Sequence, residues 1–159
     1  MLRITWDHSS KPQMFIGLNP STADESHDDP TIRRCIDFAM RWGRGGIVMA
    51  NAFAFRSTNP EPMIAMGLEA VGEENNIKYL ERLASECAAR PIACWGTKAK
   101  RVRWGFKGNL NREHELKIMM GPLDCLRITK EGCPEHPLYL PAKLMPIPYN
   151  YIENAEVLR

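Results

Sequence analysis

The sequence lacks the features that mark a secreted, zinc-binding or membrane-spanning protein. Its five cysteines are an odd number without a Cys-x-x-Cys pair, so we expect reduced thiols rather than a disulfide framework. The first ten residues, MLRITWDHSS, contain no apolar signal core. No window approaches the ~18 apolar residues of a membrane span. We therefore expect a cytoplasmic protein with no membrane partner.

An excess of charge of one sign is also missing. The 21 basic and 19 acidic residues give a net charge of +2, whereas an electrostatic nucleic-acid binder usually has a clear basic excess. This balance permits nucleic-acid binding without arguing for it. The 159 residues contain no repeat, low-complexity tract or linker. We therefore predict one domain over residues 1–159, a monomer, with an extended, proline-rich tail from about residue 142.

Short apolar runs alternate with segments of helical periodicity. The runs predict strands at 2–6, 14–18, 47–55, 91–95 and 123–129, and the periodicity predicts helices from 30, from about 61, and over 73–88, 97–103 and 110–120. Asp29 followed by Pro30 is typical of a helix N-cap. Alternation of this kind favours parallel pairing with helices on both faces. We predict an α/β fold, a three-layer α/β/α sandwich around a four-stranded parallel sheet of order 2-1-3-4, counted from the strand at 14–18.

Three polar residues follow or end the predicted parallel strands, where ligands bind in such sheets. Asn19 can orient a water molecule or hold a loop through backbone hydrogen bonds. Asn51 lies in an apolar strand, and its amide either bonds a neighbouring loop or faces a planar ligand. His136, between two prolines, is a surface histidine or a site residue. We expect all three to line one cleft.

Two charged segments allow two interpretations each. The stretch DESHDD (24–29) could hold a divalent cation through its carboxylates, or be a solvated loop ending in a helix cap. Cys133 and His136 form a Cys-x-x-His without a second ligand pair, so no zinc site is predicted. Three basic residues after the strand at 91–95 could contact phosphates or only solubilise a helix: Lys98, Lys100 and Arg101.

Four segments, taken in order, resemble the uracil-DNA glycosylase superfamily. They are GLNP (17–20), IVMANAFAF (47–55), ACWGTKAK (93–100) and HPLYLP (136–141), each at the end of a predicted strand. The sequence also resembles a family of small bacterial and phage proteins of unknown function that share GLNPSTAD and HPLYLP. Residues 102–120 depart from the superfamily pattern because the segment is longer than the resemblance leads us to expect.

The resemblance implies that the protein cleaves the N-glycosidic bond of a base in DNA without a metal or an organic cofactor. His136 would stabilise the oxygen of the leaving base, and Asn19 would place the attacking water. Asn51 would pair with the edge of a flipped base, on which Phe53 or Phe55 would stack. Gly17 and Pro20 would complete this substrate pocket.

The resemblance also implies a DNA-binding surface. Lys98, Lys100 and Arg101 would contact phosphates. Leu138 and Tyr139 would fill the gap that the flipped base leaves in the stack, unless this loop only pins the tail to the core. Two other hypotheses remain open: a non-catalytic nucleic-acid or nucleotide-binding protein of the same fold, and a metal-dependent phosphoesterase that uses the DESHDD loop.

Overall fold

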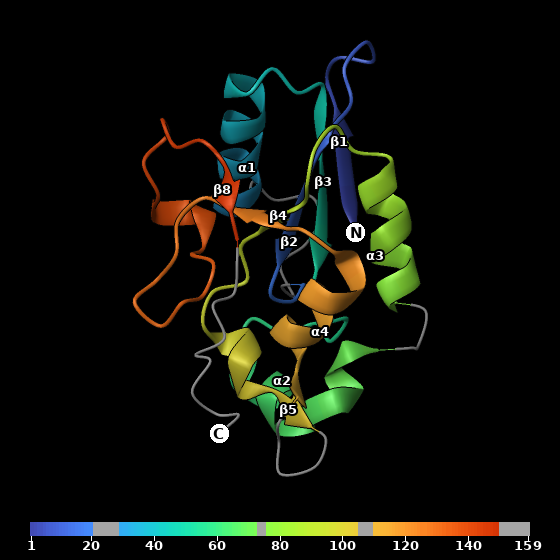
Figure 1. The fold of residues 1–159 in the computed structure, drawn as a ribbon, viewed down its shortest axis with the longest axis vertical. Helices are drawn as coiled ribbons and strands as arrows, with labels where there is room; N and C mark the ends of the chain where they lie inside the picture. Colours follow the sequence, from blue (N-terminus) through green and yellow to red (C-terminus); the bar gives the residue numbers. More distant parts are fainter. Residues whose placement is uncertain (21–28, 73–75, 105–109, 150–159) are drawn as a thin grey trace, which may run out of the picture.

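A six-stranded mixed sheet forms the centre of the protein, in the order β1-β3-β2-β4-β7-β8 (Figure 1). The computed structural model describes residues 1–20, 29–72, 76–104 and 110–149. The strands are β1 (Leu2–Thr5), β2 (Gln13–Gly17), β3 (Gly46–Asn51), β4 (Ile92–Ala93), β7 (Asp124–Cys125) and β8 (Ile147–Pro148). The four inner strands pair in parallel, and β1 and β8 pair antiparallel at the two edges.

The α/β class is confirmed, but the prediction of a four-stranded, wholly parallel sheet is wrong. The inner strands do keep the predicted order, as β3-β2-β4-β7. The first edge strand, β1, turns back beside β3, and the second, β8, lies inside the tail that the sequence predicted to be extended loop. Proline lacks a backbone N–H and is tolerated only at a sheet edge, which is the place that β8 occupies with Pro148.

Helices follow most of the inner strands. They are α1 (Pro30–Arg41), α2 (Pro60–Met66), α3 (Asn76–Ser85) and α4 (Arg112–Met120), with the 3-10 turns η1 (Gly67–Val71), η2 (Lys98–Arg101) and η4 (Pro137–Tyr139). A short antiparallel pair, β5 (Arg103–Trp104) and β6 (Leu110–Asn111), precedes α4. The predicted N-cap of α1 is confirmed, since the Asp29 carboxylate accepts the Thr31 N–H at 2.7 Å.

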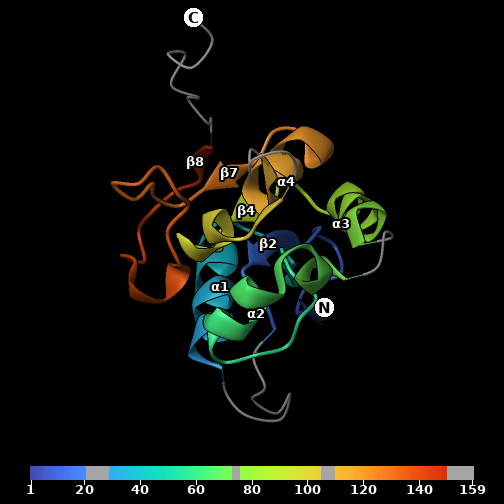
Figure 2. The ribbon, with the colours of Figure 1, turned by 90° about the horizontal axis from the view of Figure 1, so that it is seen from below.

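Apolar side chains cover both faces of the sheet. On one face Phe15 packs with Phe38 of α1, and on the other Met14 and Ile16 pack with Leu80 of α3. This alternation follows from the period of two along a strand. Figure 2 looks onto the carboxyl ends of the inner strands, with α1 and α3 on opposite sides. In the part of the chain that the structure describes, no helix has the length and apolarity needed to cross a membrane.

Candidate functional site at the carboxyl edge of the sheet

Gly17 and Asn51 end the two neighbouring strands β2 and β3 and lie opposite each other in the parallel pair. A Cβ atom on Gly17 would lie 3.0 Å from Oδ1 of Asn51 and 2.8 Å from Cε of Met49. Distances this short force a neighbour to move. Glycine at this position therefore makes room for the Asn51 amide at the end of the sheet.

Asn19 joins the loop after β2 to the loop after β3. Its Nδ2 donates to the carbonyl oxygens of Ser57 (2.7 Å), Pro20 (3.1 Å) and Phe55 (3.2 Å). The Ser57 N–H also donates a hydrogen bond to the carbonyl of Pro20 at 3.0 Å, which joins the two loops directly. Of the two roles that the sequence left open for Asn19, the geometry shows the loop-holding one. A water molecule at this residue would have to be held through Oδ1, because the NH₂ group is engaged.

The two phenylalanines that follow Asn51 differ in exposure. Phe53 is 0% exposed and belongs to the core beneath the sheet. Phe55 is half-buried and packs against the edge of that core. In this conformation only Phe55 has ring surface that a ligand could reach.

His136 is an exposed residue and the N-cap of η4. Its Nδ1 accepts the N–H of Leu138 at 3.4 Å, so the neutral ring carries its proton on Nε2. Partial loss of hydration lowers the pKa of His136, and the negative charge of Asp29 opposes this shift. His136 is thus a neutral donor above its lowered pKa. Its loop is held to the end of β4 by the Gly96 N–H, which donates to the carbonyl of Pro134 at 2.9 Å.

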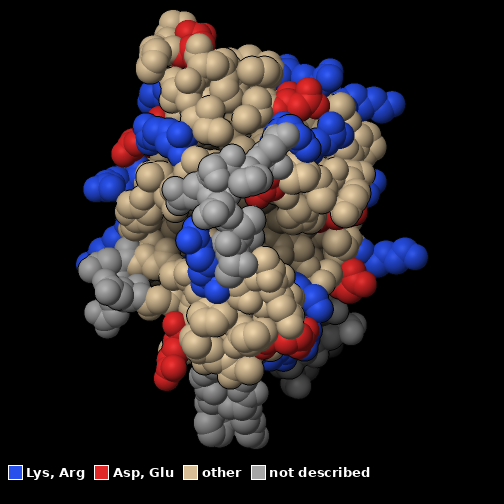
Figure 3. Space-filling view, turned by 180° about the vertical axis from the view of Figure 1, so that it is seen from behind, with Lys and Arg blue, Asp and Glu red and all other residues tan. Residues whose placement is uncertain are grey.

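The basic residues of η2 hold neighbouring segments. Arg101 makes a bidentate ion pair with Glu61 of α2 at 2.6 and 2.8 Å, and Lys98 lies 3.7 Å from the same carboxylate. Lys100 donates to the carbonyl of Glu131 at 2.8 Å. Exposed ion pairs stabilise a fold by only about 0–1 kcal/mol, so a phosphate could replace Glu61 as a partner. Figure 3 shows Lys and Arg side chains interspersed with acidic ones over one face.

The loop after His136 has a buried end and an exposed tip. Leu140 is buried against Phe38 and its neighbours, and its carbonyl accepts a hydrogen bond from Arg34. Leu138 is half-buried, whereas Tyr139 is 87% exposed. Leu140 therefore pins the loop, and Tyr139 projects from it.

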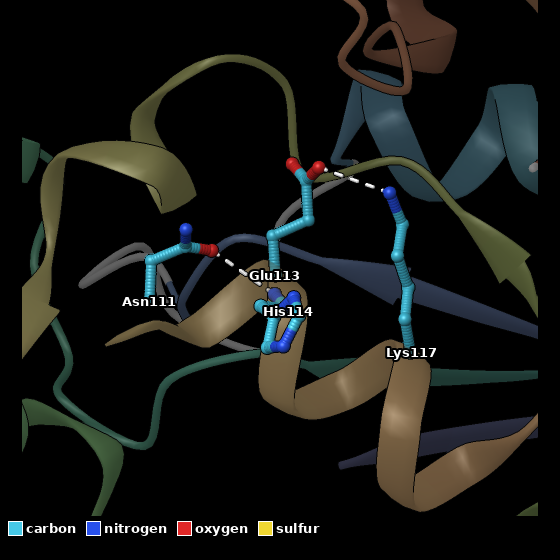
Figure 4. A pocket seen from close by; sticks show the side chains of 4 residues that line it. All are labelled: Asn111, Glu113, His114 and Lys117. Atoms are coloured by element: carbon cyan, nitrogen blue, oxygen red, sulfur yellow. Dashed lines mark hydrogen bonds and ion pairs between the residues drawn. The ribbon is translucent and has the colours of Figure 1, made fainter. Parts of the chain in front are cut away.

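Sequence reasoning missed a buried network around Glu113 on α4. This carboxylate is 1% exposed and accepts hydrogen bonds from the Tyr149 hydroxyl (2.9 Å), the Lys117 ammonium (3.1 Å) and the Trp95 indole (3.3 Å). Figure 4 shows Glu113 and Lys117 beside a small pocket that Asn111 and His114 also line. Burial lowers the pKa of Lys117, and the negative charge of Glu113 opposes this shift.

Arg112, the first residue of α4, is also buried, with 0% exposure. Its Nε donates at 2.7 Å to the carbonyl of Ala52, directly after Asn51, and its guanidinium pairs with Glu115. Its Nη2 has no hydrogen-bond partner in the part of the chain that the structure describes. The signal in the sequence was the run NREHELK, which has too many charges for one solvent face of a short helix, in a segment already longer than expected.

The proposed metal loop falls mostly outside the described residues, which include only Asp29 of the DESHDD stretch. Among the residues described, no group of three or more His, Cys, Asp and Glu side chains could hold a metal ion. Cys133 is buried, and its thiol lies 3.9 Å from the carbonyl oxygen of Glu131.

The fold and this edge define an α/β protein in which polar loops follow the ends of the parallel strands. The chain belongs to the family described as Protein of unknown function (DUF1643), which matches residues 1–138. Searches of curated proteins and of solved structures found no match. None of these comparisons links the chain to the uracil-DNA glycosylase superfamily, so that resemblance stays a prediction, as does the expectation that Asn19, Asn51 and His136 line one cleft.

Proposed function

We propose that the protein is an N-glycosylase that excises a base from DNA by hydrolysing its N-glycosidic bond. The observation that carries this proposal is the state of His136. Its Nδ1 accepts a backbone N–H, so its Nε2–H is a donor, and its lowered pKa keeps the ring neutral near pH 7. Negative charge develops on the departing base in this reaction, and a fixed donor stabilises it.

The end of β3 supplies the contacts that would recognise the base. The Asn51 amide offers a donor and an acceptor beside Gly17, which suits the polar edge of a flipped base. Phe55 takes the stacking role, because Phe53 is fully buried. Pro20, whose carbonyl accepts from Asn19 and Ser57, keeps the neighbouring loop in place.

The loops around this edge supply the contacts to the DNA backbone and stack. Tyr139 is the exposed tip that enters the gap left by the flipped base, with Leu138 supporting it. Lys98, Lys100 and Arg101 approach the phosphates. The chemistry asks for no metal or organic cofactor, because a water molecule at Asn19 is the nucleophile.

The test is base release from a panel of DNA oligonucleotides that carry uracil, other deaminated bases or alkylated bases. After incubation with the full chain, alkali cleaves the strand wherever an abasic site has formed. We expect cleavage at one class of modified base, in the presence of a metal chelator. Cleavage that depends on a divalent ion and leaves the base attached would instead identify a phosphoesterase.

A second candidate, a nucleic-acid-binding protein without catalysis, is favoured by one observation. The Asn19 amide already holds three backbone carbonyls, and no carboxylate stands in its place to activate water. Fluorescence anisotropy with the same oligonucleotides separates the two functions. Saturable binding with no abasic site across the whole panel would establish the second and exclude the first.

A further inference from the structure

The tail after His136 runs back over the protein and is fixed at several points. The Trp42 indole donates to the carbonyl of Leu144 at 3.1 Å, and the Tyr149 N–H donates to the carbonyl of Leu123 at 2.9 Å beside β8. Figure 1 shows this segment in orange and red, passing α1 before it joins the sheet. Tyr149, only 4% exposed, is the last described residue. It lies beyond residue 138, where the family match ends.

The Tyr149 side chain contacts three parts of the fold. Its ring lies edge-on to Trp95, 6.1 Å between centroids, and the Lys117 ammonium lies 3.9 Å above it. Its hydroxyl reaches Oε1 of Glu113 at 2.9 Å and the carbonyl of Gly132 at 3.0 Å. Both oxygens are acceptors, so the single hydroxyl hydrogen is divided between them.

Gly132 begins the segment that leads to His136. Other hydrogen bonds also hold this segment: among them, the Gly96 N–H donates to Pro134, the Glu135 N–H donates to Arg127 at 2.8 Å, and the Thr129 N–H donates to Cys133 at 2.8 Å. The Tyr149 hydroxyl adds a contact from the tail and connects the segment to the buried Glu113 carboxylate. A charge-assisted network of this kind fixes a loop more firmly than a neutral hydrogen bond does.

We propose that Tyr149 is a positioning residue for His136. Its hydroxyl, held by Glu113, sets the place of the Gly132–His136 segment and with it the direction of the His136 Nε2–H. The effect on catalysis rests on the proposed glycosylase function. The placement of the loop can be measured without catalysis.

The testing variant is Tyr149→Phe, which removes the hydroxyl and keeps the ring against Trp95. Because small errors in placement cost up to about 100-fold in rate, we expect kcat for base release to fall about 10- to 100-fold with little change in KM. The imidazole NMR signals of His136 should also shift. The matched control is Tyr79→Phe on α3, whose ring contacts Arg82 instead, and which should change neither quantity.

A lower melting temperature for Tyr149→Phe, with His136 signals and kcat as in the wild type, would overturn the proposal and leave Tyr149 a packing residue. If the wild-type protein releases no base, the proposed function fails. The His136 signals then decide the positioning role alone, because a shift in Tyr149→Phe but not in Tyr79→Phe supports it.

Hydrogen exchange in the wild-type protein gives a test that requires no variant. The amides of Gly96, Glu135 and Tyr149 each donate one of the hydrogen bonds described above. If the tail holds the loop, these three amides should become exposed in one opening event with one free energy. Protection of Gly96 and Glu135 that persists while Tyr149 exchanges freely would contradict the proposal.

Discussion

Polar groups at the carboxyl edge of the sheet fall into two sets, the neutral half at the ends of β2 and β3 and the charged half around α4. The two sets are accommodated in different ways. At the ends of β2 and β3 the polar groups are uncharged amides, and Asn19 is satisfied by backbone carbonyls. Around α4 they are charges, with Glu113 and Arg112 almost completely buried. Neutral groups can stand next to an opening at little cost, whereas buried charges must be paired. We infer that the amides at the ends of β2 and β3 meet the base, whereas the buried charges of Glu113 and Arg112 hold the surrounding segments in place.

Glu113→Ala should have the largest effect on stability. It leaves the Lys117 ammonium, the Tyr149 hydroxyl and the Trp95 indole without their shared acceptor. Removing one partner of a buried ionic group costs about 3–5 kcal/mol. Urea unfolding should show a loss of that size. The control is Glu81→Ala, on the exposed face of α3, which should stay within about 0.5 kcal/mol of the wild type. Equal small losses of unfolding free energy in both variants would mean that the buried charges of α4 do not hold the surrounding segments in place.

Gly17→Ala tests the neutral half and should have a smaller effect on stability. The new methyl group would meet Cε of Met49 at 2.8 Å and Oδ1 of Asn51 at 3.0 Å. Both atoms are the ends of side chains that can turn, so we expect a loss of about 1 kcal/mol, at the low end of what overpacking costs. We also expect weaker binding of the modified oligonucleotide, because the Asn51 amide must turn away. Anisotropy titration measures this, and unchanged affinity would remove Asn51 from the ligand contacts.

The pH dependence of stability should report His136. Its pKa is lower in the folded protein than the usual 6.5, so below about pH 6.5 the unfolded chain binds a proton that the folded chain does not. The stabilising contribution is therefore present above that pH and is lost as the pH falls through the folded pKa. His136→Ala should flatten the unfolding free energy measured between pH 7 and 5. In Asp29→Asn the opposing charge is gone, and the pKa of His136, measured by NMR, should fall further.

Arg112→Met should have the smallest effect, although Arg112 is wholly buried. The Nη2 group of Arg112 has no hydrogen-bond partner among the described residues, and burial lowers the pKa of Arg112. Its ionic partner Glu115 is partly exposed, so water can hydrate the carboxylate that the substitution leaves behind, and no unpaired charge stays buried. We expect a change within about 1 kcal/mol by urea unfolding. A loss as large as that of Glu113→Ala would show that both buried charges hold the surrounding segments in place equally.

The sequence predicts the neutral half of the edge better than the charged half. The start of α1 follows from Asp29 and Pro30, and the order of the inner strands agrees with the alternation of apolar runs and helices. The start of α1 and the alternation of strands and helices are local in the chain, so a pattern can show them, whereas the order of the strands is not local. The sequence predicts a strand that runs past Asn51 to residue 55, whereas β3 ends at Asn51 itself.

The charged half depends on contacts between segments that are distant in the sequence. Tyr149 meets Glu113 from 36 residues away, and the strand before it lies in a segment rich in proline. The density of charge in NREHELK indicates that not all of these side chains face solvent, but nothing local shows that Glu113 and Arg112 are the ones that point inward. Their burial depends on partners that the fold supplies, which is why sequence reasoning assigned 110–120 only to a helix.

Single-turnover release of free base tests the central claim most directly. The substrate is the oligonucleotide that the panel identifies, and the test variant is His136→Ala. The control is His8→Ala, because His8 is also exposed and lies far from the site in the sequence. If His136 stabilises the leaving base, His136→Ala should slow release by about 100- to 1000-fold, while His8→Ala and the wild type release base at the same rate. Release at the wild-type rate by His136→Ala would contradict the account.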